Sequence, residues 1–271
     1  MQTKKDTLAE IFHDTVQMCT ENKQLLSGIK TSIQGTKYYP PSVPIDPPLR
    51  EGKGNLSISQ FRSFEAAQHW HKAHPHFRIG VLNFASATRP GGGVEYGCTA
   101  QEECLCRSSS LFLVLNQNEL HEKFYNVNIL AHNPLHSDAC IYSPDIIVFK
   151  TDERHPQLMS PDDWFAVDII TCAAPDLRAA FLPTEKELYQ IHYSRANRIF
   201  QVAIDNSIDI MIMGAFGCGA FENDPTVVAK AHRDVIALYR NCFQQIEYAI
   251  YSRPFDTKNY NTFKEILFGN V

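Results

Sequence analysis

Apolar residues in the first part of the chain recur at a helical spacing and then give way to prolines. Leu8, Phe12 and Cys19 lie on one side of such a pattern, which predicts an amphipathic helix over residues 6–22. Five prolines follow between residues 33 and 55, where they exclude a regular helix and favour an extended segment on the surface. The helical spacing returns after Ser63, where we expect a second helix.

The rest of the chain alternates short apolar runs with longer helical patterns. The apolar runs predict buried strands over residues 77–82, 146–149, 167–172, 208–213 and 246–251. Helices are expected after residue 100 and over about residues 185–205 and 224–242. Strands that alternate with helices are typical of a sheet covered on both faces. The pattern therefore predicts an α/β fold with a mixed sheet flanked by helices.

Composition narrows the class of protein further. The 271 residues fit one large domain, because no linker divides the chain, and a 44% hydrophobic content is that of an ordinary globular protein. The net charge of -5 argues against a broad nucleic-acid surface, which needs clustered Lys and Arg. It does not exclude a small anionic ligand.

The eight cysteines are scattered, and the N-terminus lacks the basic and apolar regions of a signal peptide. Free thiols in a reducing cytoplasm are the simplest interpretation. Only Cys104 and Cys106 lie close together, and no second pair completes a zinc site, so we expect no metal. No stretch approaches the roughly 20 apolar residues of a membrane span.

Two glycine-rich loops follow apolar strands. The first runs from Asn83 to the consecutive Gly91, Gly92 and Gly93, whose missing side chains let a backbone approach a ligand. The second covers residues 214–221 and leads into a helix, an arrangement that binds pyrophosphate through backbone amides. Each loop alone is also compatible with a tight turn. Two such loops at strand ends favour a ligand crevice, and we expect both on one side of it.

A pair of glutamates, Glu102 and Glu103, follows the first loop at the start of a helix. Acidic residues in a first turn often only complement the helix dipole. The short distance in sequence to three glycines favours a catalytic role instead. Neighbours on a helix point roughly 100 degrees apart, so the two carboxylates cannot face one bond identically. One is expected to act as an acid and the other to hold a sugar hydroxyl.

These motifs resemble a known family. Three glycines, a gap of seven residues and Gln101-Glu102-Glu103 are similar to the signature of poly(ADP-ribose) glycohydrolases. Residues 81–85 and 100–109 resemble the short bacterial and fungal branch, and residues 217–221 resemble the family's diphosphate loop. The likeness covers roughly residues 58–255. It implies a macrodomain-like catalytic domain over residues 58–271, preceded by a helical and proline-rich accessory segment over residues 1–57.

The resemblance also implies site roles. It makes Glu103 the catalytic acid, Glu102 a contact to ribose hydroxyls and Phe221 the aromatic that presses on the distal ribose. The other implied substrate contacts are Asn83, Gly91, Gly92, Gly93, Gln101, Gly217, Cys218, Gly219 and Ala220. The diphosphate would be bound by the amides of residues 217–220. No cofactor is implied.

The implied reaction is hydrolysis of ribose-ribose bonds in poly(ADP-ribose), releasing ADP-ribose. The chain has little room for the substrate-clasping insertion of the larger animal enzymes, which favours cleavage at chain ends. One alternative is removal of a single ADP-ribose from a protein or a nucleic acid. Another is a non-catalytic ADP-ribose-binding macrodomain, against which the two glutamates argue, because binding alone needs no acid. A nucleotide-binding oxidoreductase lacks its glycine fingerprint.

Overall fold

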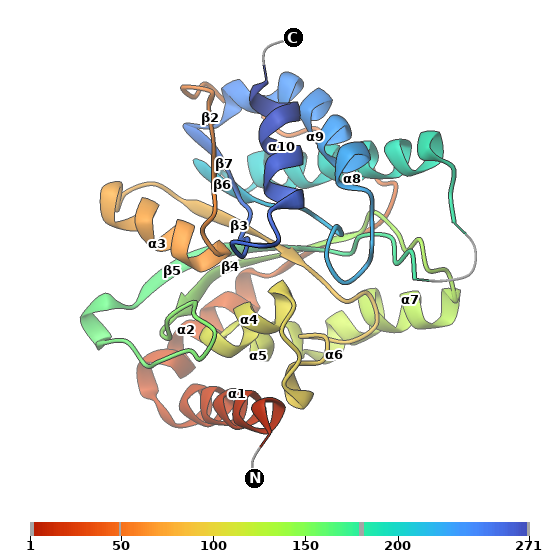
Figure 1. Cartoon of the computed structure of the whole chain (residues 1–271). Coiled ribbons are helices and arrows are strands. Elements are labelled where there is room, and N and C mark those ends of the chain that lie inside the picture. Colours follow the sequence, from red (N-terminus) through yellow and green to blue (C-terminus); the bar gives the residue numbers. More distant parts are fainter. Residues whose placement is uncertain (1–2, 49, 179–181, 270–271) are drawn as a thin grey trace.

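A seven-stranded mixed sheet runs between two layers of helices (Figure 1). The computed structural model describes residues 3–48, 50–178 and 182–269. The strand order is β1-β4-β5-β3-β6-β7-β2. β1, β4 and β5 pair antiparallel, whereas β5, β3, β6, β7 and β2 pair parallel. The predicted α/β class with a mixed sheet is therefore confirmed.

The strands match the predicted apolar runs at the centre of the sheet. They are β1 (Lys37–Tyr39), β2 (Asn55–Ser59), β3 (Ile79–Phe84), β4 (Cys140–Val148), β5 (Phe165–Cys172), β6 (Ile210–Met213) and β7 (Gln245–Ala249). β1 and β2, the two edge strands, were not predicted. β4 is longer than predicted. A register shift between Ser143 and Ile146 interrupts its apolar run, so the apolar pattern marks only the second part of the strand.

The helices lie in two groups. They are α1 (Lys4–Glu21), α2 (Lys23–Gly35), α3 (Ser63–Ala73), α4 (Gln101–Ser108), α5 (Leu111–Leu115), α6 (Asn118–Leu120), α7 (Asn126–Ala131), α8 (Glu185–Asp205), α9 (Pro225–Tyr239) and α10 (Lys258–Phe268). The helix predicted after residue 100 is broken, because Ser109 is extended and forms a bridge with Val148. α2 and α10 were not predicted.

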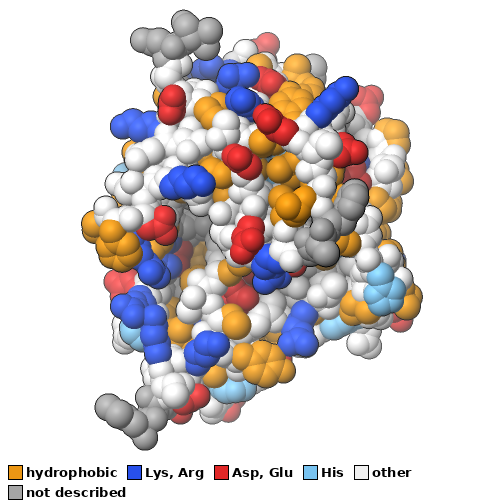
Figure 2. All heavy atoms as spheres, turned by 45° about the vertical axis from the view of Figure 1, so that its right-hand side comes forward, with side chains coloured by type: hydrophobic (Ala, Val, Ile, Leu, Met, Phe, Trp, Pro, Cys, Tyr) orange, Lys and Arg blue, Asp and Glu red, His pale blue; other side chains and the backbone are white. Residues whose placement is uncertain are grey.

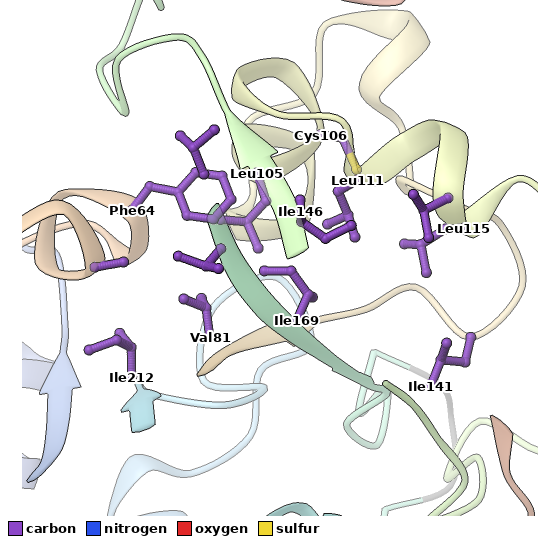
Figure 3. Packing of buried hydrophobic residues seen from close by; sticks show 14 of the residues in the cluster. Phe64, Val81, Leu105, Cys106, Leu111, Leu115, Ile141, Ile146, Ile169 and Ile212 are labelled. Carbon is purple, nitrogen blue, oxygen red and sulfur yellow. The ribbon is translucent and has the colours of Figure 1, made fainter. Parts of the chain in front are cut away.

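Alternate residues of the central strands enter two separate cores. Val81 and Ile169 belong to the core beneath α1 to α7, which is drawn from close by in Figure 3. Leu82 and Ile170 belong to the core beneath α8, α9 and α10. Burial on both faces explains why the central strands read as continuous apolar runs.

The N-terminal segment is part of the same sheet. The helix predicted over residues 6–22 is confirmed as α1, whose start is capped by reciprocal bonds between Thr3 and Asp6. The extended segment predicted from residue 33 begins slightly later, since α2 continues to Gly35. β1 and β2 then pair with β4 and β7, so a boundary between residues 57 and 58 falls within β2.

The eight cysteines are all free thiols. Within the described ranges, no helix combines the length and the apolar character needed to cross a membrane.

Candidate active site

A cavity of about 930 Å³ lies at the carboxyl ends of β3, β6 and β7. Gly92 and Gly93 of the first loop line it, together with Gly217, Gly219, Ala220 and Phe221 of the second. Both loops therefore border one crevice, as the sequence predicts. The face drawn in Figure 2 is hollowed, and Lys and Arg side chains lie around the hollow.

The triple-glycine loop passes directly against the two glutamates. Gly91 and Gly92 have φ angles of 67° and 56°, in the left-handed region that favours glycine. A Cβ atom on Gly92 would lie 2.6 Å from Oε1 of Glu103 and 3.3 Å from Oε2 of Glu102. Gly92 thus permits the close approach of backbone and carboxylates. Gly91 does not line the cavity and acts through the conformation of the loop.

Glu103 presents one carboxylate oxygen that has no protein partner. Its side chain is almost fully buried and lines the cavity. Oε1 accepts a hydrogen bond of 3.0 Å from the Gly93 N–H, whereas Oε2 is buried and unpaired. A buried polar atom without a partner is costly, and a ligand in the cavity can supply that partner.

Glu102 is buried more deeply, and both of its oxygens are paired. Oε2 accepts a 2.7 Å hydrogen bond from the Ser86 N–H, and Oε1 accepts one of 3.2 Å from Nδ2 of Asn83. Burial raises the pKa of Glu102 to about 8, although these two hydrogen bonds act in the opposite direction. At neutral pH this raised pKa favours the protonated form of Glu102.

Two residues predicted as substrate contacts form hydrogen bonds within the protein that position other parts of the site. Asn83 is completely buried, donates to Glu102 and to Oγ1 of Thr171, and does not line the cavity. Its Oδ1 is buried without a protein partner. Gln101 lines the cavity, but its amide accepts from the Phe84 N–H and donates to the Leu82 carbonyl. These bonds fix the start of α4 to the end of β3.

Gly217 and Gly219 of the second loop have different structural reasons to be glycine. Gly217 has a φ of 78°, and a Cβ atom there would lie 2.6 Å from Cβ of Ala174. Its substitution would disturb the fold. A Cβ atom on Gly219 would meet nothing within 4 Å, although the residue lines the cavity. The open space at Gly219 is therefore available to a ligand.

Asn223 holds the second loop in shape, a role that sequence reasoning missed. Its Nδ2 donates to the carbonyls of Pro175, Gly217 and Phe221 over 2.8, 3.0 and 3.2 Å. The helix that follows is capped by the next residue, Asp224, which accepts from the Thr226 N–H. Asn223 instead fixes the carbonyls of the loop.

The remaining residues of the second loop differ in their access to the cavity. Ala220 and Phe221 line it, and the Arg178 guanidinium lies 5.2 Å from the centre of the Phe221 ring. The Cys218 side chain does not line it, and burial raises the pKa of its thiol. A thiol held protonated is a poor nucleophile, so Cys218 can serve the site only through its backbone.

Further residues border the cavity that the sequence did not mark as functional, including Lys4, Lys5, Arg62, Arg89 and Tyr251. Lys4 and Lys5 are separated from the triple glycine by more than 80 residues, so no local motif connects them to the site. Within the described parts of the chain, no three His, Cys, Asp or Glu side chains come together as metal ligands.

The part of the chain that contains the first glycine loop matches a known protein family. Residues 5–151 match the model of the microbial-type poly(ADP-ribose) glycohydrolase catalytic domain. This stretch contains the triple glycine and both glutamates. A search of curated protein sequences gives no match.

Solved structures extend the similarity over nearly the whole chain. A poly(ADP-ribose) glycohydrolase from Thermomonospora curvata, bound to the inhibitor ADP-HPD, is 26% identical with a TM-score of 0.82, over 95% of this chain and 98% of that one. A poly(ADP-ribose) glycohydrolase from Deinococcus radiodurans, in complex with ADP-ribose, is 29% identical with a TM-score of 0.76, over 89% and 97% of the two chains.

Proposed function

Since the chain belongs to the microbial-type poly(ADP-ribose) glycohydrolase family, we propose that this glycosidase uses Glu103 as the acid that hydrolyses the ribose-ribose bonds of poly(ADP-ribose). The observation that carries the assignment is that Glu103 lines the cavity and that its Oε2 is buried without a protein partner. Of the two glutamates, Glu103 is the one with an oxygen that no protein group binds.

In the proposed reaction, protonated Glu103 gives its proton to the oxygen that links the two riboses. The bond between that oxygen and the anomeric carbon breaks, which leaves an oxocarbenium-like sugar and a Glu103 carboxylate. Water then adds to the anomeric carbon and gives its proton back to Glu103. Glu102, placed alongside by Ser86 and Asn83, orients the ribose hydroxyls.

The diphosphate of the substrate is bound, in this proposal, by the backbone amides of residues 217–220. Two observations support it: the space at Gly219 is open to the cavity, and the loop leads into the N-terminus of α9. No Lys or Arg occurs in residues 214–221, so within the loop itself the backbone and the helix dipole supply the attraction. The ring of Phe221 then packs on the distal ribose.

Cleavage at chain ends and a cytoplasmic location are further parts of the proposal. A cavity of about 930 Å³ has the size of a site for one small ligand, which suits a terminal ADP-ribose unit. Eight free cysteines fit a reducing compartment.

The test is to incubate the purified protein with labelled poly(ADP-ribose) and, separately, with a mono-ADP-ribosylated protein. We expect ADP-ribose from the polymer from the first time point, with the remaining chains shortened one unit at a time and without early fragments of several units, and little release from the mono-modified protein. Release from the mono-modified protein alone would indicate the first alternative, a mono-ADP-ribosyl hydrolase. Binding without release from either substrate would indicate the second, a non-catalytic reader.

A further inference from the structure

Three basic residues border the cavity beside the triple-glycine loop. Lys4 and Lys5 are exposed in the first turn of α1, and Arg89 is exposed just before the glycines. The Arg89 guanidinium lies 5.7 Å from the centre of the Tyr96 ring, which is 62% exposed. A Cβ atom on Gly97 would lie 2.2 Å from the Lys5 carbonyl oxygen, so α1 packs directly on the residue after Tyr96. We call Lys4, Lys5, Arg89 and Tyr96 the α1 rim.

The α1 rim is connected to the catalytic carboxylate through touching residues. The Gly93 N–H donates to Glu103, and a Cβ atom on Gly93 would lie 2.6 Å from Sγ of Cys98. Cys98 adjoins Gly97, on which the first turn of α1 rests. The rim thus begins on the wall that holds Glu103, whereas the amides proposed for the diphosphate come from the loop after β6.

The charge of the α1 rim is not explained by the fold. Lysines in a first turn oppose the helix dipole, and the capping box of Thr3 and Asp6 already satisfies that end of α1. In the described ranges, no salt bridge involves Lys4, Lys5 or Arg89. Asp6 accepts from the Thr3 N–H in the capping box, and within the same ranges neither it nor Glu95 forms a salt bridge with these cations. Unpaired basic residues thus gather at one cavity edge of a protein with net charge -5.

We propose that the α1 rim binds the unit of poly(ADP-ribose) next to the one that is removed. The inference rests on the proposed function, because the bond at Glu103 joins these two units and the rest of the polymer must leave the cavity beside that residue. Lys4, Lys5 and Arg89 attract the diphosphate of the neighbouring unit. The exposed ring of Tyr96 stacks on its adenine.

The α1 rim therefore acts on polymer only. A free ADP-ribose, or the last unit attached to a protein, occupies the cavity without reaching the rim. Substitution of the rim should raise KM for polymer, leave kcat and the affinity for ADP-ribose unchanged, and weaken the dependence of KM on salt.

The experiment compares the double variant Lys4→Gln/Lys5→Gln with Lys23→Gln/Lys30→Gln. The second pair has the same change of charge at exposed positions of α2 that do not line the cavity. We expect a rise of about tenfold in polymer KM for the first variant and a salt slope smaller by about 1. Tyr96→Ser should raise polymer KM by at least about fivefold. All three variants should bind ADP-ribose with the parental Kd in calorimetry.

A polymer KM equal to that of the parent in Lys4→Gln/Lys5→Gln would overturn the proposal. So would a matching loss of ADP-ribose affinity, because the lysines would then serve the terminal unit. A third result would also overturn the proposal: the parent cleaves DNA-linked ADP-ribose faster than polymer, and the rim variants raise KM for the DNA substrate alone. The rim would then bind nucleic acid. A parent protein that releases nothing from polymer is a separate result, which refutes the proposed function itself.

Discussion

Gly219→Val offers a selective test of the diphosphate loop, because the substitution changes the cavity and little else. A Cβ atom at this position meets no neighbour within 4 Å, and the φ angle is outside the left-handed region. The folded protein should therefore accept valine without strain. Its branched side chain would stand in the open space through which a diphosphate approaches the amides.

The expected loss follows from the hydrogen bonds that the valine prevents. One hydrogen bond to a charged group contributes about 1.5–3 kcal/mol, which corresponds to about 10- to 150-fold in affinity. We expect the Kd for ADP-ribose to rise by at least about tenfold, with a thermal midpoint close to that of the parent. Calorimetry and thermal unfolding monitored by circular dichroism measure the two quantities.

A matched control adds the same side chain away from the cavity. Ala166→Val places it at an exposed position of β5, where β-branched residues are favoured, and should change neither quantity. A folded Gly219→Val protein that binds ADP-ribose with the parental Kd would refute the assignment of the second loop to the diphosphate.

Three other substitutions test the roles assigned to Glu102, Cys218 and Asn223. Since burial raises the pKa of Glu102 from 4.5 to about 8, the folded state retains a proton that the unfolded state loses, and stability should fall as pH rises between these values. Glu102→Gln should flatten this decline, so that its thermal midpoint exceeds that of the parent at pH 8; equal pH profiles would contradict the buried proton. Cys218→Ala should hydrolyse polymer within about threefold of the parental rate, because the thiol is outside the cavity and is held protonated; a loss of two orders of magnitude would make the thiol catalytic. Asn223→Ala removes the Nδ2 donor from three carbonyls, of which those of Gly217 and Phe221 keep a backbone N–H donor, and should cost about 1–3 kcal/mol in urea unfolding while weakening ADP-ribose binding; unchanged values would show that the loop is held otherwise.

The centre of the sheet was predictable from sequence, and its edges were not. β3, β5 and β6 are buried on both faces, which requires apolar residues at nearly every position. β2 is an edge strand with polar residues and no fully buried position, and β1 has three residues. Neither leaves a readable pattern. Their place is determined by pairing with strands far away in the sequence.

The same distinction applies to the site. The two glycine loops and the glutamate pair are visible because each lies within a few consecutive residues. The direction of each carboxylate depends on contacts that sequence does not display, such as the bond from Asn83 to Thr171 across two strands. The packing of Lys5 on Gly97 joins residues separated by most of a hundred positions. Sequence therefore indicates the reacting groups, and the fold is needed to identify the residues that position them.

The measurement that tests the central claim most directly is a comparison of Glu103→Gln with the parent in polymer hydrolysis and ADP-ribose binding. Glutamine keeps an oxygen for the Gly93 N–H but cannot give a proton to the leaving ribose. We expect turnover to fall by about two to four powers of ten, while the Kd for ADP-ribose stays within about threefold. Hydrolysis by Glu103→Gln at the parental rate would contradict the account, because the acid would then lie elsewhere in the cavity.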